Sequence, residues 1–343
     1  MYVQKLNNIV KMKKKLLIIG TGSIAKRHLK NVRKIKKNQQ ILIYSKNKTR
    51  VKKLINKFDK GVALIKKIDN KIKNNVSHAI IATNTNANTN FLRKIINFPI
   101  NIYCEKPLVD DSSFDFLKNK YFNSIKSKKV KIGFQFRFNP AIDFLKRELE
   151  KKENKNVFLF NFMCGQNLKD WRGEKNHKKF YSAGKKEYSS VFWELCHEID
   201  LVNYLFGFPI KIYSSHVNSK FLKLKAKDIS ITHLFLKKKL SGQISVEMLS
   251  PVLYRKLIVV TLNNHYELDL VNNLITKRNK YSTKKYKFKN SRNEMFKFYI
   301  KNFMENKKKS KNFDYSDLND GMKVTNIIRA MIKSNKIGKK IIL

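Results

Sequence analysis

Residues 16–25 read LLIIGTGSIA and decide the fold of the first half of the chain. An apolar run at 16–19 leads directly into a glycine pattern of the form G-x-G-x-x-A. In this pattern Gly20 permits a tight turn, Gly22 lets a phosphate approach the backbone, and Ala25 keeps the next helix close to the strand. The first amides and the positive dipole end of that helix favour an anion. The segment predicts a Rossmann domain that binds a dinucleotide through Gly20, Gly22, Ser23 and Ile24.

Short apolar runs alternate with helix-like segments up to about residue 131, which is typical of βαβ units. We expect strands at 16–19, 41–44, 79–82, 100–104 and 130–134. Between the first two, residues 24–35 carry an apolar stripe typical of a helix. At about 150 residues per domain, a chain of 343 residues has room for two domains.

The pattern changes after Pro140. A helix at 141–151 is followed by segments predicted as strands at 157–162, 210–217, 229–235, 240–248, 256–262 and 266–270. One long helix over 191–206 interrupts them, and helical patterns close the chain. Strands in series favour an antiparallel sheet. The predicted fold is α/β, with an N-terminal Rossmann domain at 12–136 and a C-terminal α/β domain at 137–343 that contains a large, mostly antiparallel open sheet.

The end of the second predicted strand bears on the choice of dinucleotide. In NAD-binding domains an acid about 20 residues beyond the glycines holds the ribose 2′-hydroxyl. Here residues 43–50 read IYSKNKTR and contain no carboxylate. Ser45, Lys46 and Arg50 can instead meet a 2′-phosphate. NADP and NAD both remain open, with NADP slightly favoured.

The formal net charge of +50 raises the question of a polyanionic partner. The lysines, however, are spread over almost every segment, and arginine is scarce. Lys, Asn and Ile share AT-rich codons, which accounts for the excess, so no specific nucleic-acid partner is expected. A polyanion-binding protein is an alternative that charge alone supports.

No apolar run approaches the ~18 residues of a transmembrane helix. The run at 16–19 is too short for a secretory signal. Cys104, Cys164 and Cys196 show neither a disulfide framework nor metal-ligand spacing. We therefore expect a cytoplasmic protein without membrane insertion and without a metal site.

A second strand end carries the chemistry. The strand at 100–104 ends in Glu105-Lys106-Pro107, and in a parallel sheet such ends face the ligand crevice. Lys106 is therefore expected to point toward the reactive ring of the cofactor. Together with GTGSIAKRH (20–28), IAT (81–83), GFQFRFNP (133–140) and CHEID (196–200), this strand end resembles the Gfo/Idh/MocA oxidoreductase family in motif order and spacing.

The resemblance implies NAD(P)-dependent oxidation or reduction of sugars and an open sheet that forms dimers or tetramers. It also implies a catalytic role for Lys106 and His197. Cofactor contacts would come from Thr83, Asn84, Glu105 and Lys106, and substrate contacts from Arg137, Asn139 and His197. Residues 170–172 (DWR) and 181–183 (YSA) resemble members associated with surface-polysaccharide sugars, which adds Trp171, Arg172 and Tyr181.

The chain departs from the family pattern at several positions. Asn84 replaces a frequent Pro, Asn88 a common His, and residues 188–190 (YSS) a glycine triplet. Trp193 stands where the family often has Asp, with Glu194 as the nearest acid before His197.

The helix expected at 191–206 supports the histidine assignment independently. Its apolar stripe is formed by Leu195, Ile199, Val202 and Phe206, and its opposite side carries Glu194, His197, Asp200 and Tyr204. A carboxylate one turn before and one turn after His197 is expected to orient the ring or raise its pKa. The alternative is a surface histidine in a ladder of ion pairs.

These observations predict an NAD(P)-dependent oxidoreductase that acts on a hydroxyl or keto group of a sugar or sugar derivative. Lys106 would hydrogen-bond the reacting oxygen, His197 would move the hydroxyl proton, and Glu194 would orient or replace it. An NAD-dependent glycosidase and a non-catalytic cofactor- and sugar-binding sensor or subunit on the same fold are alternatives. The expected partners are a small sugar and further copies of the chain, as a homodimer or homotetramer.

Overall fold

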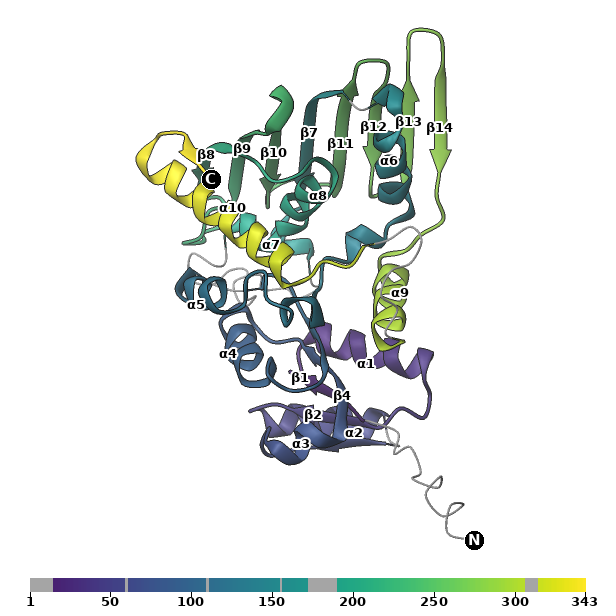
Figure 1. Ribbon diagram of the computed structural model, residues 1–343, viewed down its shortest axis with the longest axis vertical. Helices are drawn as coiled ribbons and strands as arrows, with labels where there is room; N and C mark the ends of the chain where they lie inside the picture. The colour runs from purple at the N-terminus through teal and green to yellow at the C-terminus, as the bar shows by residue number, and fades with distance from the viewer. Residues whose placement is uncertain (1–14, 59–60, 109–110, 155, 172–189, 306–313) are drawn as a thin grey trace.

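The computed structural model describes residues 15–58, 61–108, 111–154, 156–171, 190–305 and 314–343. Their two sheets have different architectures (Figure 1). The first is a parallel six-stranded sheet in the order β3-β2-β1-β4-β5-β6. Its strands are β1 (Lys15–Ile19), β2 (Ile41–Tyr44), β3 (Val62–Leu64), β4 (Val76–Ile81), β5 (Asn101–Cys104) and β6 (Val130–Ile132).

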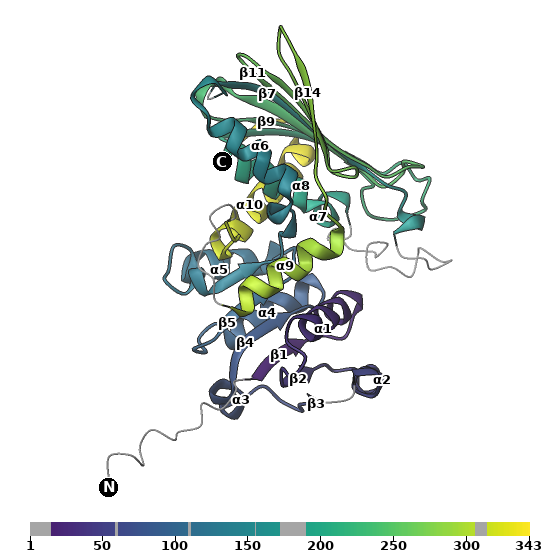
Figure 2. The ribbon, with the colours of Figure 1, turned by 90° about the vertical axis from the view of Figure 1, so that its right-hand side faces the viewer.

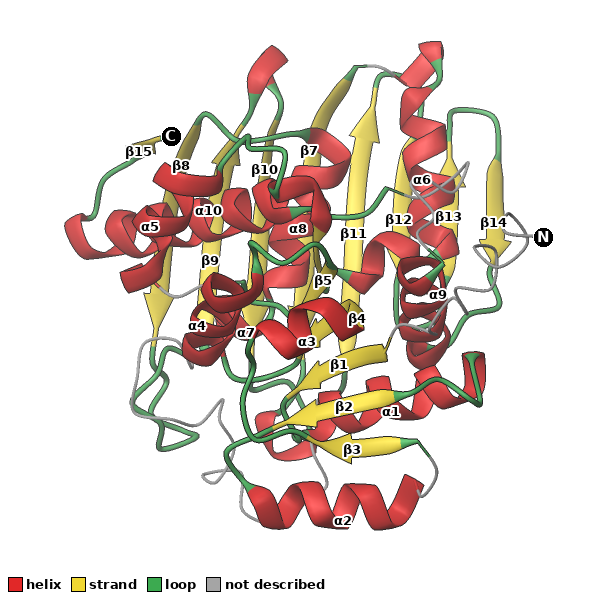
Figure 3. Cartoon of the chain, turned by 60° about the horizontal axis from the view of Figure 1, so that its bottom comes forward, coloured by secondary structure: helices red, strands yellow, loops and turns green. Residues whose placement is uncertain are grey.

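The strand order of this sheet reverses between β1 and β4. Ligands of open α/β sheets bind at such a switch point, outside the carboxyl ends of the strands. The helices around the sheet are α1 (Ser23–Ile35), α2 (Lys48–Phe58), α3 (Asn70–Asn75), α4 (Thr85–Ile95) and α5 (Asp111–Tyr121), as Figure 3 shows. The predicted Rossmann architecture is confirmed.

The second sheet has nine strands in the order β14-β13-β12-β11-β7-β10-β9-β8-β15. All neighbours pair antiparallel except β7 and β10. The mostly antiparallel sheet expected from the sequence is therefore confirmed. The strands are β7 (Val157–Gly165), β8 (Lys211–Val217), β9 (Ile229–Phe235), β10 (Ser241–Glu247), β11 (Tyr254–Thr261), β12 (His265–Asp269), β13 (Leu274–Arg278), β14 (Thr283–Lys287) and β15 (Ile341–Ile342).

One face of this sheet is covered by helices. In Figure 2 the sheet is seen edge-on, with α6 (Pro140–Glu150), α8 (Cys196–Phe206) and α10 (Leu318–Ile337) on the same face. Buried and exposed residues alternate along β8 and β9, as expected when only one face is covered. The remaining elements are α7 (Val191–Glu194), α9 (Arg292–Met304) and the 3-10 helices η1 (Ser127–Lys129), η2 (Gln135–Phe138), η3 (Lys152–Asn154), η4 (Leu168–Asp170) and η8 (Lys237–Lys239).

The helix predicted over 191–206 is wrong as a single element. It is divided into α7 and α8 at Leu195, whose φ of −100° and ψ of 37° are not helical. The short or edge strands β3, β13, β14 and β15 were not predicted. The sequence of β14 is TKKYK and its side chains are mostly exposed, so it offers no apolar alternation to read.

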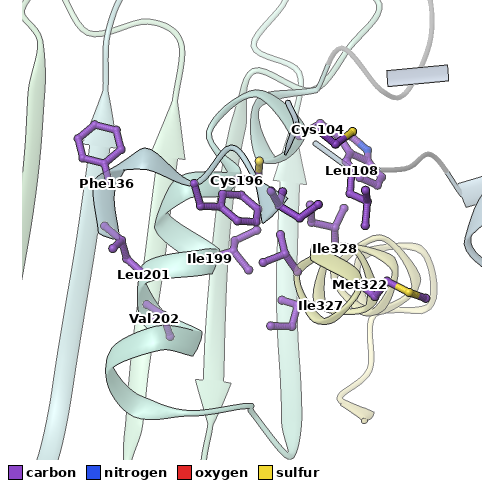
Figure 4. Packing of buried hydrophobic residues seen from close by; sticks show 14 of the residues in the cluster. Cys104, Leu108, Phe136, Cys196, Ile199, Leu201, Val202, Met322, Ile327 and Ile328 are labelled. Atoms are coloured by element: carbon purple, nitrogen blue, oxygen red, sulfur yellow. The ribbon is translucent and has the colours of Figure 1, made fainter. Parts of the chain in front are cut away.

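The two sheets share one hydrophobic core at their junction. In Figure 4, Cys104 and Leu108 at the end of β5 lie beside α8 and α10, with Cys196, Ile199, Met322, Ile327 and Ile328 among the packed side chains. Gly321 permits this approach, because a methyl group there would lie 2.8 Å from Leu108 Cδ2. The loop that carries Lys106 is thus held between both parts of the molecule. The domain border predicted at residues 136 and 137 falls inside η2 and stays a prediction.

The C-terminal part also completes the first sheet. The Tyr299 hydroxyl and the Ser316 hydroxyl both donate to the carbonyl oxygen of Ile132 in β6, at 2.7 and 2.6 Å. The Ile132 amide donates to the Ser316 carbonyl at 2.9 Å.

Among the described helices, none is long and apolar enough to cross a membrane.

Candidate active site

The glycine loop has the geometry of a phosphate cradle. Gly20 adopts a φ of +118°, and a methyl group there would lie 2.2 Å from the carbonyl oxygen of Ala82. Gly22 lies directly before α1, and a methyl group there would have no atom within 4 Å. No side chain caps the start of α1, and uncapped first amides of a helix are suited to bind an anion. The described residues therefore fit the pyrophosphate of a dinucleotide.

The residue that follows β2 is the uncharged Ser45, and basic residues come after it in the chain. Thr21 Oγ1 and Ser45 Oγ lie 3.3 Å apart in a hydrogen bond that joins the glycine loop to this strand end. Lys46 and Arg50 are exposed to solvent. Ser45 is thus placed beside the loop, and the two cations lie at the surface beyond it.

The loops after β4 and β5 are tied together by Asn88. Its amide donates to the carbonyl oxygen of Glu105 at 3.1 Å, and its side-chain oxygen accepts from the Thr83 hydroxyl at 2.7 Å. The side chain of Asn84 caps α4 by accepting from the Ala87 amide at 3.2 Å. Asn88, a departure from the family pattern, fixes both strand ends against each other.

The Glu105 carboxylate is buried and occupied by protein groups. His28 Nε2 lies 2.6 Å from its Oε1, and the Tyr103 hydroxyl donates to the same oxygen at 3.0 Å. His28 comes from α1, so this contact locks the helix of the glycine loop against β5. The cofactor contact predicted for Glu105 stays a prediction, because its carboxylate already has these partners.

Lys106 reaches from β5 to the second domain. Its ammonium donates to the carbonyl oxygen of Glu194, the last residue of α7, at 2.6 Å. In a continuous helix that carbonyl would accept from the amide four residues later. Because the helix is broken at Leu195, the carbonyl oxygen of Glu194 accepts from the Lys106 ammonium instead.

His197 is buried at the start of α8, 6% exposed. Its ring packs edge-on against Phe134 and Phe136, with centroids 5.9 and 5.1 Å away. Its Nε2 lies 3.4 Å from the amide nitrogen of Gln135. Because an amide nitrogen only donates, the assigned geometry makes Nε2 the acceptor and leaves the proton of the neutral ring on Nδ1.

The pKa of His197 lies well below its ordinary value, and the expectation that its neighbours raise it is wrong. Burial disfavours the charged ring most, and the positive charges of Lys106, Arg255 and Arg292 lower the pKa further. His197 is therefore neutral at neutral pH and has a lone pair available to take a proton.

In the described part of the chain, neither carboxylate expected to flank His197 forms a hydrogen bond with it. Asp200 accepts from Arg137 Nε at 2.9 Å and from Arg137 Nη2 at 2.6 Å. Burial raises the pKa of Asp200 to about 6, although Arg137 opposes that shift. No hydrogen bond joins the Glu194 carboxylate to His197 in the described part of the chain. The orienting role proposed for Glu194 stays a prediction.

Arg137 joins three elements and is 3% exposed. Besides Asp200 of α8, it binds Asp320 of α10 through Nη1 at 3.0 Å. Asn139 caps α6 by accepting from the Ala141 amide at 2.8 Å and donates to the Asn273 side chain at 2.9 Å. These contacts fix η2 and with it Gln135 beside His197, and the substrate contacts predicted for Arg137 and Asn139 stay predictions.

Two family models match this chain. An oxidoreductase family with an NAD-binding Rossmann fold matches residues 14–118, and the C-terminal alpha/beta domain of the same family matches residues 156–343. The chain belongs to the Gfo/Idh/MocA oxidoreductase family. Membership makes it an oxidoreductase with a dinucleotide-binding Rossmann domain, in agreement with the glycine loop.

Several solved structures are similar in fold to almost the whole chain. Levoglucosan dehydrogenase in complex with NADH is 14% identical with a TM-score of 0.81, covering 96% of this chain and 98% of that one. A UDP-N-acetylglucosamine 3-dehydrogenase from Acidithiobacillus ferrooxidans is 14% identical with a TM-score of 0.74, covering 94% and 98%. A myo-inositol dehydrogenase from Corynebacterium glutamicum is 16% identical with a TM-score of 0.74, covering 96% and 99%. No curated protein matches the chain in sequence.

Substrate contacts were also predicted for Trp171, Arg172 and Tyr181. Trp171 is half-buried and its indole nitrogen donates to the carbonyl oxygen of Gln166 at 3.2 Å. Arg172 and Tyr181 lie outside the described residues. Within the described ranges, no group of three or more His, Cys, Asp or Glu side chains is placed to hold a metal.

Sequence reasoning missed several residues near His197. Gln135 lies inside the motif GFQFRFNP, so its proximity to the histidine could have been suspected from its position. Arg255 forms an ion pair with the buried Glu198, with Nε 2.7 Å from Oε1, and its guanidinium lies 4.4 Å from the Phe136 ring centroid. Nothing in the sequence brings Arg255 or Arg292 to this site.

Proposed function

We propose that the protein oxidises a hydroxyl group, or reduces the corresponding keto group, of a sugar or sugar derivative. One observation carries this proposal: Lys106, at a strand end beside the glycine cradle, reaches into the second domain next to the buried, neutral His197. A bound nicotinamide dinucleotide supplies the hydride acceptor or donor. The protein supplies binding, orientation and movement of the hydroxyl proton.

Lys106 and His197 have separate tasks. One ammonium hydrogen of Lys106 is held by the Glu194 carbonyl, which fixes the side chain and leaves two donors for the reacting oxygen. These donors stabilise negative charge as it develops on that oxygen. His197 Nε2 takes the hydroxyl proton, since the long contact with Gln135 is easily exchanged for a substrate hydroxyl. Such general base help is typically worth ~10²–10⁴-fold.

The sugar class is supported by the fold relatives. Dehydrogenases for levoglucosan, myo-inositol and UDP-N-acetylglucosamine share this fold. Within that class we propose a sugar of surface-polysaccharide metabolism, supported by the segment DWR at 170–172.

We propose NADP as the preferred cofactor. Ser45 is held beside the glycine loop, and Lys46 and Arg50 are exposed next to it. No acid follows β2 before residue 58 to hold a free ribose 2′-hydroxyl. A 2′-phosphate would find neutralising charge there, whereas the unphosphorylated ribose would find only Ser45.

We also propose that the uncovered face of the nine-stranded sheet pairs with a second copy of the chain. Tyr213, Val217 and Ile231 from β8 and β9 are each about two-fifths exposed on that face (39%, 46% and 41%). A dimer or tetramer buries these three side chains, and sedimentation would measure the oligomeric state.

The free cysteines Cys104, Cys164 and Cys196 fit a reducing compartment such as the cytoplasm.

The direct test is a substrate panel with both cofactors. Purified protein would be mixed with NAD or NADP and with levoglucosan, myo-inositol, UDP-N-acetylglucosamine and free hexoses, and the absorbance of the reduced nicotinamide recorded. We expect turnover with at least one sugar, faster at limiting NADP than at limiting NAD. Binding of cofactor and sugar without any turnover would favour the sensor alternative. Cofactor affinity tenfold higher for NAD, about 1.4 kcal/mol, would overturn the NADP preference.

A further inference from the structure

We propose that Arg255 is a positioning residue for His197, which it supports through the ring of Phe136. The inference rests on the proposed function, in which His197 takes the hydroxyl proton, and it adds the residue that sets the state of this base. It starts from a continuous run of contacts from β11 to the histidine ring.

Arg255 lies in β11 with its side chain on the helix-covered face of the large sheet. Leu257 and Val259, two and four positions further along the strand, are fully buried, and alternate residues of a strand share a face. From this face the guanidinium contacts Glu198 of α8 and Phe136 of η2. Arg255 therefore connects the sheet to both elements that surround His197.

The contact with Glu198 fixes the guanidinium. Glu198 follows His197 directly in α8, and its side chain is fully buried. Arg255 Nε lies 2.7 Å from Glu198 Oε1 in an ion pair. Because a buried carboxylate without a partner is costly, this ion pair holds Arg255 against the helical turn that carries His197.

The contact with Phe136 carries the effect to the histidine. The guanidinium carbon of Arg255 lies 4.4 Å from the centroid of the Phe136 ring, within the range of a cation–π interaction. The Phe136 ring is edge-on to the His197 ring, with centroids 5.1 Å apart and an angle of 70° between the planes. Arg255 thus restrains an aromatic ring that helps to bury His197.

The charge of Arg255 acts in the same direction as this burial. Charged side chains on the surrounding elements include Lys106, Arg137, Arg292, Glu194, Glu198 and Asp200. Asp200 is bound by Arg137, and Glu198 by Arg255. Burial lowers the pKa of His197 most, and the charges of Lys106, Arg255 and Arg292 lower it further. Loss of Arg255 would remove one of these charges and loosen the Phe136 ring, and both changes raise the pKa of His197.

The test measures the protonation of His197 directly, by NMR of the full chain with isotope-labelled histidine. His197→Asn assigns the ring signals. In the parent the ring should stay neutral through the ordinary histidine range. In Arg255→Met the midpoint of the His197 titration should move upward by about one pH unit or more.

Two further variants separate the guanidinium from a general effect of charge loss. Arg255→Lys keeps the charge but lacks the planar group that stacks on Phe136, so the midpoint should move upward less than in Arg255→Met. Arg278→Met is the matched control, because Arg278 is an arginine of the same sheet that is paired with Glu267. It should leave the His197 titration unchanged.

Arg255→Met leaves Glu198 buried without its partner and can fail to fold for that reason. The double variant Arg255→Met with Glu198→Gln removes both charges. It should still move the midpoint upward, because Phe136 is no longer restrained.

A His197 titration that coincides with that of the parent, in Arg255→Met or in the double variant, would overturn the proposal. A lowered unfolding temperature without a change in this titration would likewise reduce Arg255 to a structural role. None of these measurements needs a substrate, so they are independent of the proposed function. Failure to turn over any sugar would count against that function alone, and the NMR titration would still decide the role of Arg255.

Discussion

Replacing Arg137 by Met should destabilise the protein severely. The guanidinium makes three charged hydrogen bonds of 2.6 to 3.0 Å to Asp200 and Asp320. The side chains of Arg137 and Asp200 are 4% and 1% exposed. Removing one partner of such a buried pair leaves an uncompensated charge, at a cost of ~3–5 kcal/mol. That is a large part of a typical unfolding free energy of about 5–15 kcal/mol.

The assay is denaturant unfolding followed by fluorescence, with Arg278→Met as the control. Arg278 pairs with Glu267, and both side chains are more than two-fifths exposed, so its loss should cost less than about 1 kcal/mol. If Arg137→Met does not fold, the double variant Arg137→Met with Asp200→Asn should regain part of the stability, because the orphaned charge is gone. Equal effects of Arg137→Met and Arg278→Met would refute the reasoning.

The deficit of Arg137→Met should shrink in acid. The folded pKa of Asp200 is about 6 in the parent, above the ordinary Asp value. Without Arg137 it rises further, because the guanidinium was lowering it. A folded state that binds the extra proton gains stability as pH falls through the folded pKa. Unfolding curves at about pH 5 should therefore separate variant and parent less than curves at neutral pH.

Three further predictions concern positions outside this ion pair. Gly20→Ala should lower the unfolding temperature by several degrees and Gly22→Ala should not, because only the first methyl meets Ala82 and a positive φ; equal unfolding temperatures would contradict this. Asn88→Ala should lower stability by about 1–3 kcal/mol and reduce kcat, since both strand ends lose a shared partner; an unchanged kcat would show that Lys106 does not depend on this link. The three cysteines should not react with a thiol reagent until the protein unfolds, because burial raises the pKa of each thiol, that of Cys196 to about 12; fast labelling of the native protein would contradict their burial.

Local patterns predicted much of the fold and the cofactor half of the site. The glycine loop depends on a strand, a turn and a helix that are contiguous in sequence, so residues 16–25 were enough to assign it. The strand end at Lys106 follows from the same rule for parallel sheets. Both lie where they were expected.

The substrate half depends on contacts between distant segments. Helical spacing predicted that Asp200 lies beside His197. In the structure the Asp200 carboxylate instead accepts hydrogen bonds from Arg137, 63 positions away in sequence. At the helix break at Leu195, Lys106 of the other domain donates a hydrogen bond to the carbonyl oxygen of Glu194. The low pKa of His197 comes from Phe134 and Phe136 burying the ring and from cations on other elements. No local pattern contains these tertiary effects.

The central claim, that Lys106 and His197 share one active site, is tested most directly by the turnover of Lys106→Met together with the pH–rate profiles of the parent and of His197→Asn. Once a sugar substrate is found, Lys106→Met should abolish turnover while calorimetry shows nearly unchanged cofactor affinity. His197→Asn should turn over ~10²–10⁴-fold more slowly. The parent's rate of sugar oxidation should fall only at a pH below the ordinary histidine range, because the pKa of His197 is lowered, and His197→Asn should lack that fall. Turnover by both variants at the parent's rate, with the parent's pH profile, would contradict the claim.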